Sequence, residues 1–152
     1  MDKPQFVYVT YIRSTPEKVW DAITTPEFSR QYWGGGDNVS SWKKGSKWQH
    51  VADDEKHSVR ITGEVLESIP PKRLVLTWAD PAEPADVSRV TFEIEPIDDM
   101  VRLNVVHGNF KPGSLMINKV SQGWPLVLAS MKSFLENGKG LNIWAAKKPC
   151  GS

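Results

Sequence analysis

The sequence predicts an α+β domain in which a curved antiparallel sheet wraps around one long C-terminal helix. Apolar residues alternate in successive short runs through the middle of the chain, which is typical of antiparallel strands with one buried face. A stripe at helical spacing then follows over residues 119–135. Because the sheet and the helix each present one apolar face, packing them together buries both.

The N-terminal part of the chain predicts one strand and two short helices. Residues 6–13 are rich in β-branched and aromatic side chains, which favours a strand. Thr15-Pro16 and Thr25-Pro26 each supply an N-cap followed by proline at the first helical position. Gly34-Gly35-Gly36 ends the second helix, and we interpret it as a flexible connection at the mouth of a pocket.

The central part, from Trp48 onward, predicts four or five strands. In the four clearest the apolar residues share one parity, so that each strand turns one face inward. Pro70-Pro71, residues 81–86 and Asp98-Asp99 separate these strands as turns or loops. Gly63 predicts a bend or bulge, which a strongly curved sheet needs. The inward residues expected are Val59, Ile61, Gly63 and Val65; Leu74, Leu76 and Trp78; Val90, Phe92 and Ile94; and Leu103, Val105 and His107.

The C-terminal helix is expected to start near Lys119 and to end at Asn137-Gly138. Pro125 removes a backbone hydrogen bond inside this stretch, which predicts a kink or a helix start at residues 121–124. We expect residues 1–152 to form a single domain, with a core over residues 6–138 and a C-terminal tail over residues 139–152.

Composition argues against several classes of partner. The formal net charge of +1 gives no field that would attract nucleic acid or an anionic membrane. No apolar run is long enough for a signal peptide or a membrane span, so we expect a cytoplasmic protein without membrane insertion. Cys150 is the only cysteine, and His50 and His57 match no metal-ligand spacing. We therefore predict no metal site and no cofactor.

Segments spread along the chain carry a family resemblance: residues 16–27, 32–34, 63–67, 71–74, 77–78, 88–93, 106–108, 123–124 and 135–138. In this order they resemble the single-domain relatives of the C-terminal domain of the heat-shock-protein-90 ATPase activator, within the START-like (SRPBCC) superfamily. The resemblance covers residues 6–138 and implies a helix-grip fold with an internal cavity. The activators themselves carry a further N-terminal domain that contacts the chaperone, and this chain has no room for it. A chaperone partner is therefore an alternative and not the leading expectation.

The expected site is that cavity, with His107 as a polar group that orients the ligand. We expect it to bind a small apolar or amphipathic molecule, as a carrier or sensor with a possible link to stress. The alternatives are core filling for each tryptophan and, for His107, a histidine satisfied by neighbouring groups. The expected ligand-binding residues are Trp33, Trp78, Phe92, His107, Trp124, Leu128 and Met131.

Two other function classes stay open. A cyclase- or hydrolase-type enzyme would use His107 and Glu67 as acid and base in the same cavity. A chaperone-interacting protein would expose an apolar patch on the outer face of the sheet. No nucleophile elbow or dinucleotide fingerprint is present, which favours binding without hydrolytic or redox chemistry. The oligomeric state is not predicted.

Overall fold

One antiparallel sheet and three helices make up residues 4–144, which are the residues described in a computed structural model. The strands pair in the order β1-β7-β6-β5-β4-β3-β2. The elements in chain order are β1 (Phe6–Ile12), α1 (Pro16–Thr24), α2 (Pro26–Tyr32), β2 (Asp37–Ser40), β3 (Lys47–Val51), β4 (Val59–Ile69), β5 (Arg73–Trp78), β6 (Ser88–Ile97), β7 (Met100–Gly108) and α3 (Met116–Asn137).

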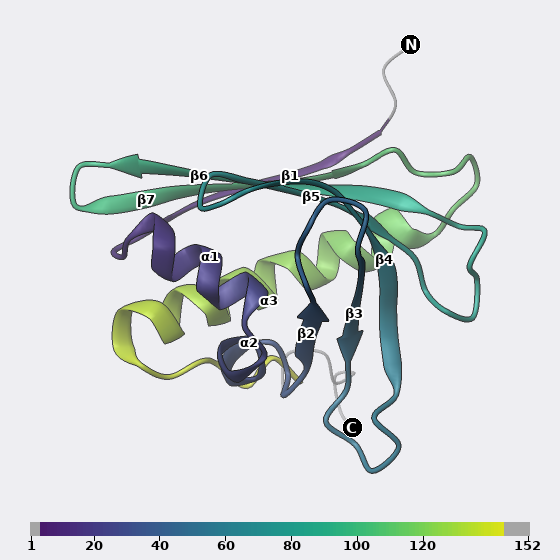
Figure 1. The fold of residues 1–152 in the computed structure, drawn as a ribbon, viewed down its shortest axis with the longest axis horizontal. Helices are drawn as coiled ribbons and strands as arrows, with labels where there is room; N and C mark the ends of the chain where they lie inside the picture. Colours follow the sequence, from purple (N-terminus) through teal and green to yellow (C-terminus); the bar gives the residue numbers. More distant parts are fainter. Residues whose placement is uncertain (1–3, 145–152) are drawn as a thin grey trace.

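The three helices all lie on one face of the sheet, with α3 running beneath the central strands (Figure 1). Strands β2, β3 and β4 turn down from the plane of the other four, so the sheet curls around the helices. This arrangement confirms the predicted helix-grip α+β fold. None of the helices in the described part of the chain has the length and apolar character needed to cross a bilayer.

The curl is concentrated in β4, which changes its pairing partner along its length. Lys47 to Val51 pair with the first half of β4, whereas β5 pairs with the second half, and the register shifts between Val65 and Glu67. Near this change, the Trp48 indole donates a 2.8 Å hydrogen bond to the Thr77 carbonyl directly over Gly63. A side chain on Gly63 would collide with that carbonyl, so this close approach of β4 to β5 requires glycine at position 63.

Helix α1 and the end of α3 form for the reasons that the sequence suggested, whereas Thr25 makes no side-chain capping hydrogen bond at the start of α2. The Thr15 side chain accepts a hydrogen bond from the Lys18 amide, and Pro16 opens α1. Gly138 ends α3 in the left-handed conformation and donates its amide to the Phe134 carbonyl. The predicted inward residues of β5, β6 and β7 are all buried in the core.

One predicted boundary is wrong, and one strand was not predicted. Helix α3 starts at Met116 rather than near Lys119 and continues through Pro125, so no helix starts at residues 121–124. Its first amide is bonded by Ser114, while Leu115 at the N-cap position offers no capping side chain. Strand β2 was not predicted because its four residues contain one apolar side chain, Val39, which is exposed.

The chain after Gly138 packs against the helices instead of leaving the fold. Ile143 is only 3% exposed and belongs to the apolar core. The Leu141 amide donates to the Ser130 hydroxyl at 2.8 Å, and the Trp144 indole donates to the Gly34 carbonyl at 3.2 Å. The packed core therefore reaches beyond residue 138, while Cys150 lies outside the described residues.

Candidate functional site

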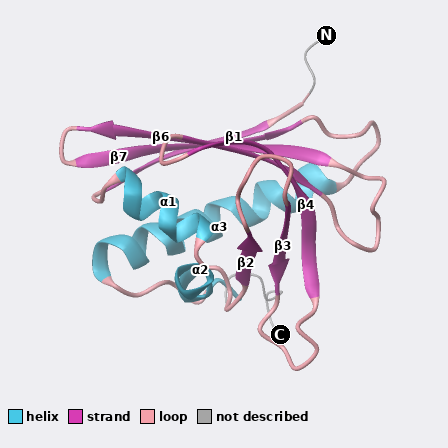
Figure 2. Cartoon of the chain, in the orientation of Figure 1, coloured by secondary structure: helices cyan, strands magenta, loops and turns pink. Residues whose placement is uncertain are grey.

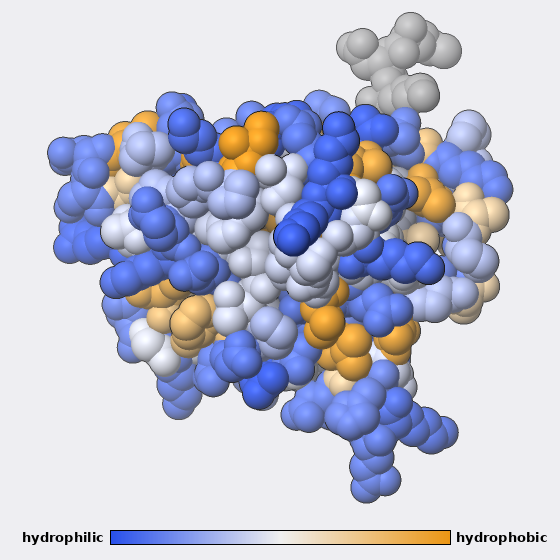
Figure 3. All heavy atoms as spheres, in the orientation of Figure 1, coloured by the Kyte–Doolittle hydropathy of each residue, from blue (hydrophilic) through white to orange (hydrophobic). Residues whose placement is uncertain are grey.

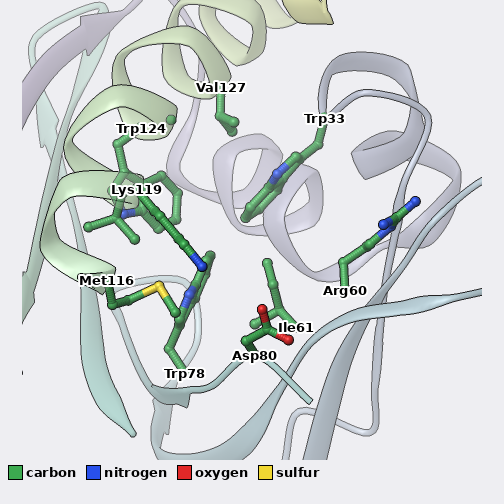
Figure 4. A pocket seen from close by; sticks show the side chains of 11 residues that line it. Trp33, Arg60, Ile61, Trp78, Asp80, Met116, Lys119, Trp124 and Val127 are labelled. Atoms are coloured by element: carbon green, nitrogen blue, oxygen red, sulfur yellow. The ribbon is translucent and has the colours of Figure 1, made fainter. Parts of the chain in front are cut away.

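A half-open pocket of about 200 Å³ lies where α3, the start of β4 and the end of β5 separate (Figure 4). Its volume exceeds the roughly 150 Å³ that accommodates benzene and falls below the roughly 300 Å³ at which drug-sized sites begin. It therefore suits a molecule of one or two rings. The lining residues are Trp33, Arg60, Ile61, Trp78, Asp80, Met116, Lys119, Val120, Gly123, Trp124 and Val127.

Three tryptophans from separate elements form the wall. Trp33 ends α2 and donates its amide to the Ser29 carbonyl at 2.8 Å, Trp78 is the last residue of β5, and Trp124 lies on α3. Their ring centroids are 5.4, 5.5 and 6.4 Å apart, within the range of favourable aromatic contact. Because each ring touches the other two, the wall is an interlocked apolar surface.

The turn that positions Trp33 is packed, in contrast to the flexible connection expected there. Gly34 adopts a φ of +60°, in the region that favours glycine, and the Trp144 ring lies against it. The Gly36 amide donates to the Trp33 carbonyl at 2.9 Å. Trp33 also contacts the ring of His50, which lies buried on β3 and not in an exposed loop.

His107 lies behind the wall and is fully buried. The Trp124 indole nitrogen, which only donates, lies 3.1 Å from His107 Nδ1, so Nδ1 is the acceptor. The imidazole proton is then on Nε2, 2.8 Å from the Ser88 hydroxyl oxygen. Burial lowers the pKa of His107 to about 3, which keeps the ring neutral. His107 thus holds Trp124 in place.

The residues required for acid–base chemistry are not brought together. Because His107 Nε2 carries the proton, it donates to Ser88 and has no lone pair to accept the serine proton. Glu67 is half-exposed and pairs with Arg73 at 3.2 Å. Arg73 precedes the inward Leu74 on β5, so Arg73 and Glu67 lie on the outer face of the sheet, away from His107.

The predicted site residues divide into two groups. Trp33, Trp78 and Trp124 line the pocket. The other four are packed in the interior, because the sheet and α3 close on each other there and separate only toward the start of α3. These four are Phe92, His107, Leu128 and Met131.

The mouth of the pocket carries charged residues that the sequence analysis did not single out. Lys119 reaches over the opening from α3, whereas Arg60 points away from it (Figure 4). Arg60 has a 64% exposed side chain and lies 3.8 Å from Asp54. Asp80 accepts a hydrogen bond from the Ala82 amide. Within residues 4–144, no three His, Cys, Asp or Glu side chains gather as a metal site requires.

Several apolar residues of the pocket that were not among the predicted site residues share a helical spacing that is visible in the sequence. Met116, Val120, Gly123 and Val127 are spaced by four, three and four positions, which places them on one helix face. No pattern in the sequence groups the charged residues of the pocket. Arg60 lies on β4, Asp80 in the loop after β5 and Lys119 on α3, and these segments meet only in the folded chain.

Comparison with known proteins gives one family and a set of similar folds. The family model described as activator of Hsp90 ATPase homolog 1-like protein matches residues 13–136. No curated protein matches the chain. The Aha1 dimer from Colwellia psychrerythraea is 21% identical with a TM-score of 0.75, covering 90% of this chain and 99% of that one.

Two further solved structures are similar over most of their length. An Hsp90 activator from Plasmodium falciparum is 21% identical with a TM-score of 0.74, covering 86% of this chain and 95% of that one. A protein from Mesorhizobium loti is 27% identical with a TM-score of 0.73, covering 87% and 96%. These similarities show the fold, whereas the function of the pocket depends on the residues that line it.

Proposed function

The chain belongs to the family of activator of Hsp90 ATPase homolog 1-like proteins, and from this premise we propose that it binds a small apolar or amphipathic organic molecule as a carrier or sensor. The observation that carries the proposal is the pocket walled by Trp33, Trp78 and Trp124. Indole rings offer large apolar surfaces at low conformational cost, and a few polar groups at the mouth supply orientation.

The pocket volume sets the affinity to expect. A ligand of one or two rings has roughly 12 heavy atoms, and each contributes about 0.3 to 0.6 kcal/mol in a site of this kind. The sum of about 4 to 7 kcal/mol corresponds to dissociation constants from about 1 mM to about 10 μM. Calorimetry and NMR titration at high protein concentration cover this range.

Gly123→Leu is expected to block binding while the protein stays folded. Gly123 lines the pocket, and a side chain built there has open space in front of it. Leucine is a better helix former than glycine, so the change fills the pocket without weakening α3. We expect the dissociation constant for a naphthalene-based probe to rise at least about tenfold in NMR titration.

Ala129→Leu is the matched control, because Ala129 lies on the exposed side of the same helix. It adds a leucine to α3 without entering the pocket and should leave the dissociation constant unchanged. If Gly123→Leu binds the probe as tightly as the wild-type protein does, the pocket is not the binding site.

Binding is favoured over catalysis because the acid–base pair that an enzyme was expected to use, His107 and Glu67, does not face this pocket. His107 has both ring nitrogens engaged, and Glu67 lies on the other face of the sheet. Asp80 is the one carboxylate among the lining residues, and its mouth position suits recognition of a polar group. The tryptophan wall needs no such pair to hold a ligand.

A second candidate function is contact with a chaperone of the Hsp90 class through strand β1. The side chains of Val7, Val9 and Tyr11 are 52%, 46% and 45% exposed on this edge strand, opposite to the core-facing Phe6 and Tyr8. Exposed apolar residues along a sheet edge favour a protein partner. On the face seen in Figure 3, by contrast, apolar surface is broken into small patches among hydrophilic residues.

Val9→Lys is expected to weaken this contact about tenfold, because it replaces an apolar side chain at the centre of the edge with a charge. The measurement is the ATPase rate of a purified Hsp90-type chaperone titrated with this protein. Ala129→Lys, on the exposed side of α3, adds the same charge elsewhere and should behave as the wild-type protein does. An ATPase rate that does not respond to the wild-type protein removes the second candidate.

A further inference from the structure

We infer that the ligand of the tryptophan-walled pocket is an amphipathic organic anion, with one or two aromatic rings inside and its negative group held at the mouth by Lys119. This inference rests on the proposed function and names the class of ligand. Its basis is the contrast between the apolar wall and the charges around the opening.

The charged side chain that reaches over the opening is positive. Among the lining residues, Lys119 and Arg60 are cationic and Asp80 is anionic. Arg60 points away and shares its charge with Asp54, whereas Lys119 reaches over the pocket (Figure 4). Within residues 4–144, Lys119 has no carboxylate partner within 4 Å, so its ammonium group is available to a ligand.

Asp80 is already partly engaged by its own loop. Its Oδ1 accepts the Ala82 amide at 2.9 Å, which satisfies part of the carboxylate without a ligand. The loop that contains it, between β5 and β6, lies beside the β7–α3 loop at the same end of the sheet (Figure 2). Asp80 therefore marks the rim opposite α3 and disfavours an anion there, which leaves the α3 side for the negative group.

Three indole rings also form the kind of wall that binds a cationic group through cation–π contact. Here the ammonium group of Lys119 already reaches over the same opening. A cationic ligand would meet a like charge as it entered, and an anionic ligand would meet an opposite one. The geometry therefore favours the anion.

Three probes of nearly equal shape test the charge preference: 2-naphthoate, the neutral 2-naphthamide and the cationic 2-naphthylmethylammonium. In calorimetry at low ionic strength, we expect naphthoate to bind about three to ten times more tightly than naphthamide, and the cation to bind most weakly. In 0.5 M NaCl the preference for the anion should shrink, because screening acts on the exposed charges at the mouth.

Two variants should move the naphthoate affinity in opposite directions. Lys119→Met is expected to remove the preference for naphthoate over naphthamide, and Asp80→Asn to increase it. The readout for both variants is the ratio of the naphthoate and naphthamide dissociation constants, which a uniform change in packing at the mouth would leave unchanged. Lys72→Met is the control, because Lys72 precedes the far end of β5, about 20 Å along the strand from Trp78.

The outcomes separate this inference from the proposed function. If naphthamide binds as tightly as naphthoate, or Lys119→Met weakens both equally, the anion assignment is overturned and the pocket stays a ligand site. If the cation binds most tightly, the charge assignment is reversed. If none of the three probes binds, the proposed function fails together with the inference.

Discussion

Gly63→Ala is expected to lower the free energy of unfolding by about 3 kcal/mol or more. The added methyl group would occupy the space of the Thr77 carbonyl on β5 and would press on the Trp48 indole nitrogen. Overpacking against side chains typically costs about 1 to 3 kcal/mol, and here the obstacle is backbone that cannot rotate away. The hydrogen bond from Trp48 to Thr77 would be strained as well, which removes about 1 kcal/mol.

Urea unfolding monitored by tryptophan fluorescence measures this effect. Gly123→Ala is the matched control, because its new methyl group meets nothing within 4 Å and lies inside α3. Alanine in a helix is more favourable than glycine by about 0.5 to 1 kcal/mol, so this variant should be slightly more stable than the wild-type protein. If the Gly63→Ala midpoint equals that of the wild-type protein, β4 is not held against β5 as closely as described.

The fold was predictable because its signals are local. Alternating apolar residues give the buried face of each strand, and Thr15-Pro16 gives the start of α1. The predictions failed where the stabilising contact comes from elsewhere in the chain. Asn38 on β2 illustrates this, because its side-chain amide donates to the Ile23 carbonyl and its backbone amide to Ser29. No periodicity within β2 itself indicates those partners.

The candidate site was predictable only in part, for a geometric reason. Side-chain parity tells which residues point inward, but it does not tell at which end of the sheet α3 separates from the strands. Trp78 and Phe92 both point inward, yet Trp78 lines the pocket and Phe92 makes a T-shaped contact with Trp124 inside the core. The depth of a residue along the sheet depends on strand register, which single-sequence patterns do not supply.

The stability of the protein is expected to fall in acid because of His107. Its pKa is about 3 in the folded protein and about 6.5 in an unfolded chain, so the unfolded state binds the extra proton between these values. The contribution is therefore fully present above about pH 6.5 and is lost as the pH falls toward 3. Between pH 7 and 4.5 we expect the free energy of unfolding to drop by about 2 to 3 kcal/mol from this residue.

His107→Gln isolates the effect, because an amide can accept from Trp124 and donate to Ser88 but does not titrate in this range. Urea unfolding at pH 7 and pH 4.5 should show a drop about 2 kcal/mol smaller for this variant than for the wild-type protein. His57→Gln removes an exposed histidine and should keep the wild-type drop. Equal drops for His107→Gln and the wild-type protein would mean that His107 is not held neutral by burial.

Protonation of His107 also affects the tryptophan wall of the pocket. A protonated imidazole donates from both nitrogens, so it cannot accept the hydrogen bond of the Trp124 indole. Protonation of His107 therefore removes the contact that fixes one side of the pocket. In the folded protein this protonation occurs only near the His107 pKa of about 3, so ligand affinity should decline as the pH falls from about 4 toward 3. Measured with 2-naphthamide, which does not change charge in this range, the affinity of His107→Gln should stay nearly constant, so a decline in the wild-type protein alone reports loss of the wall.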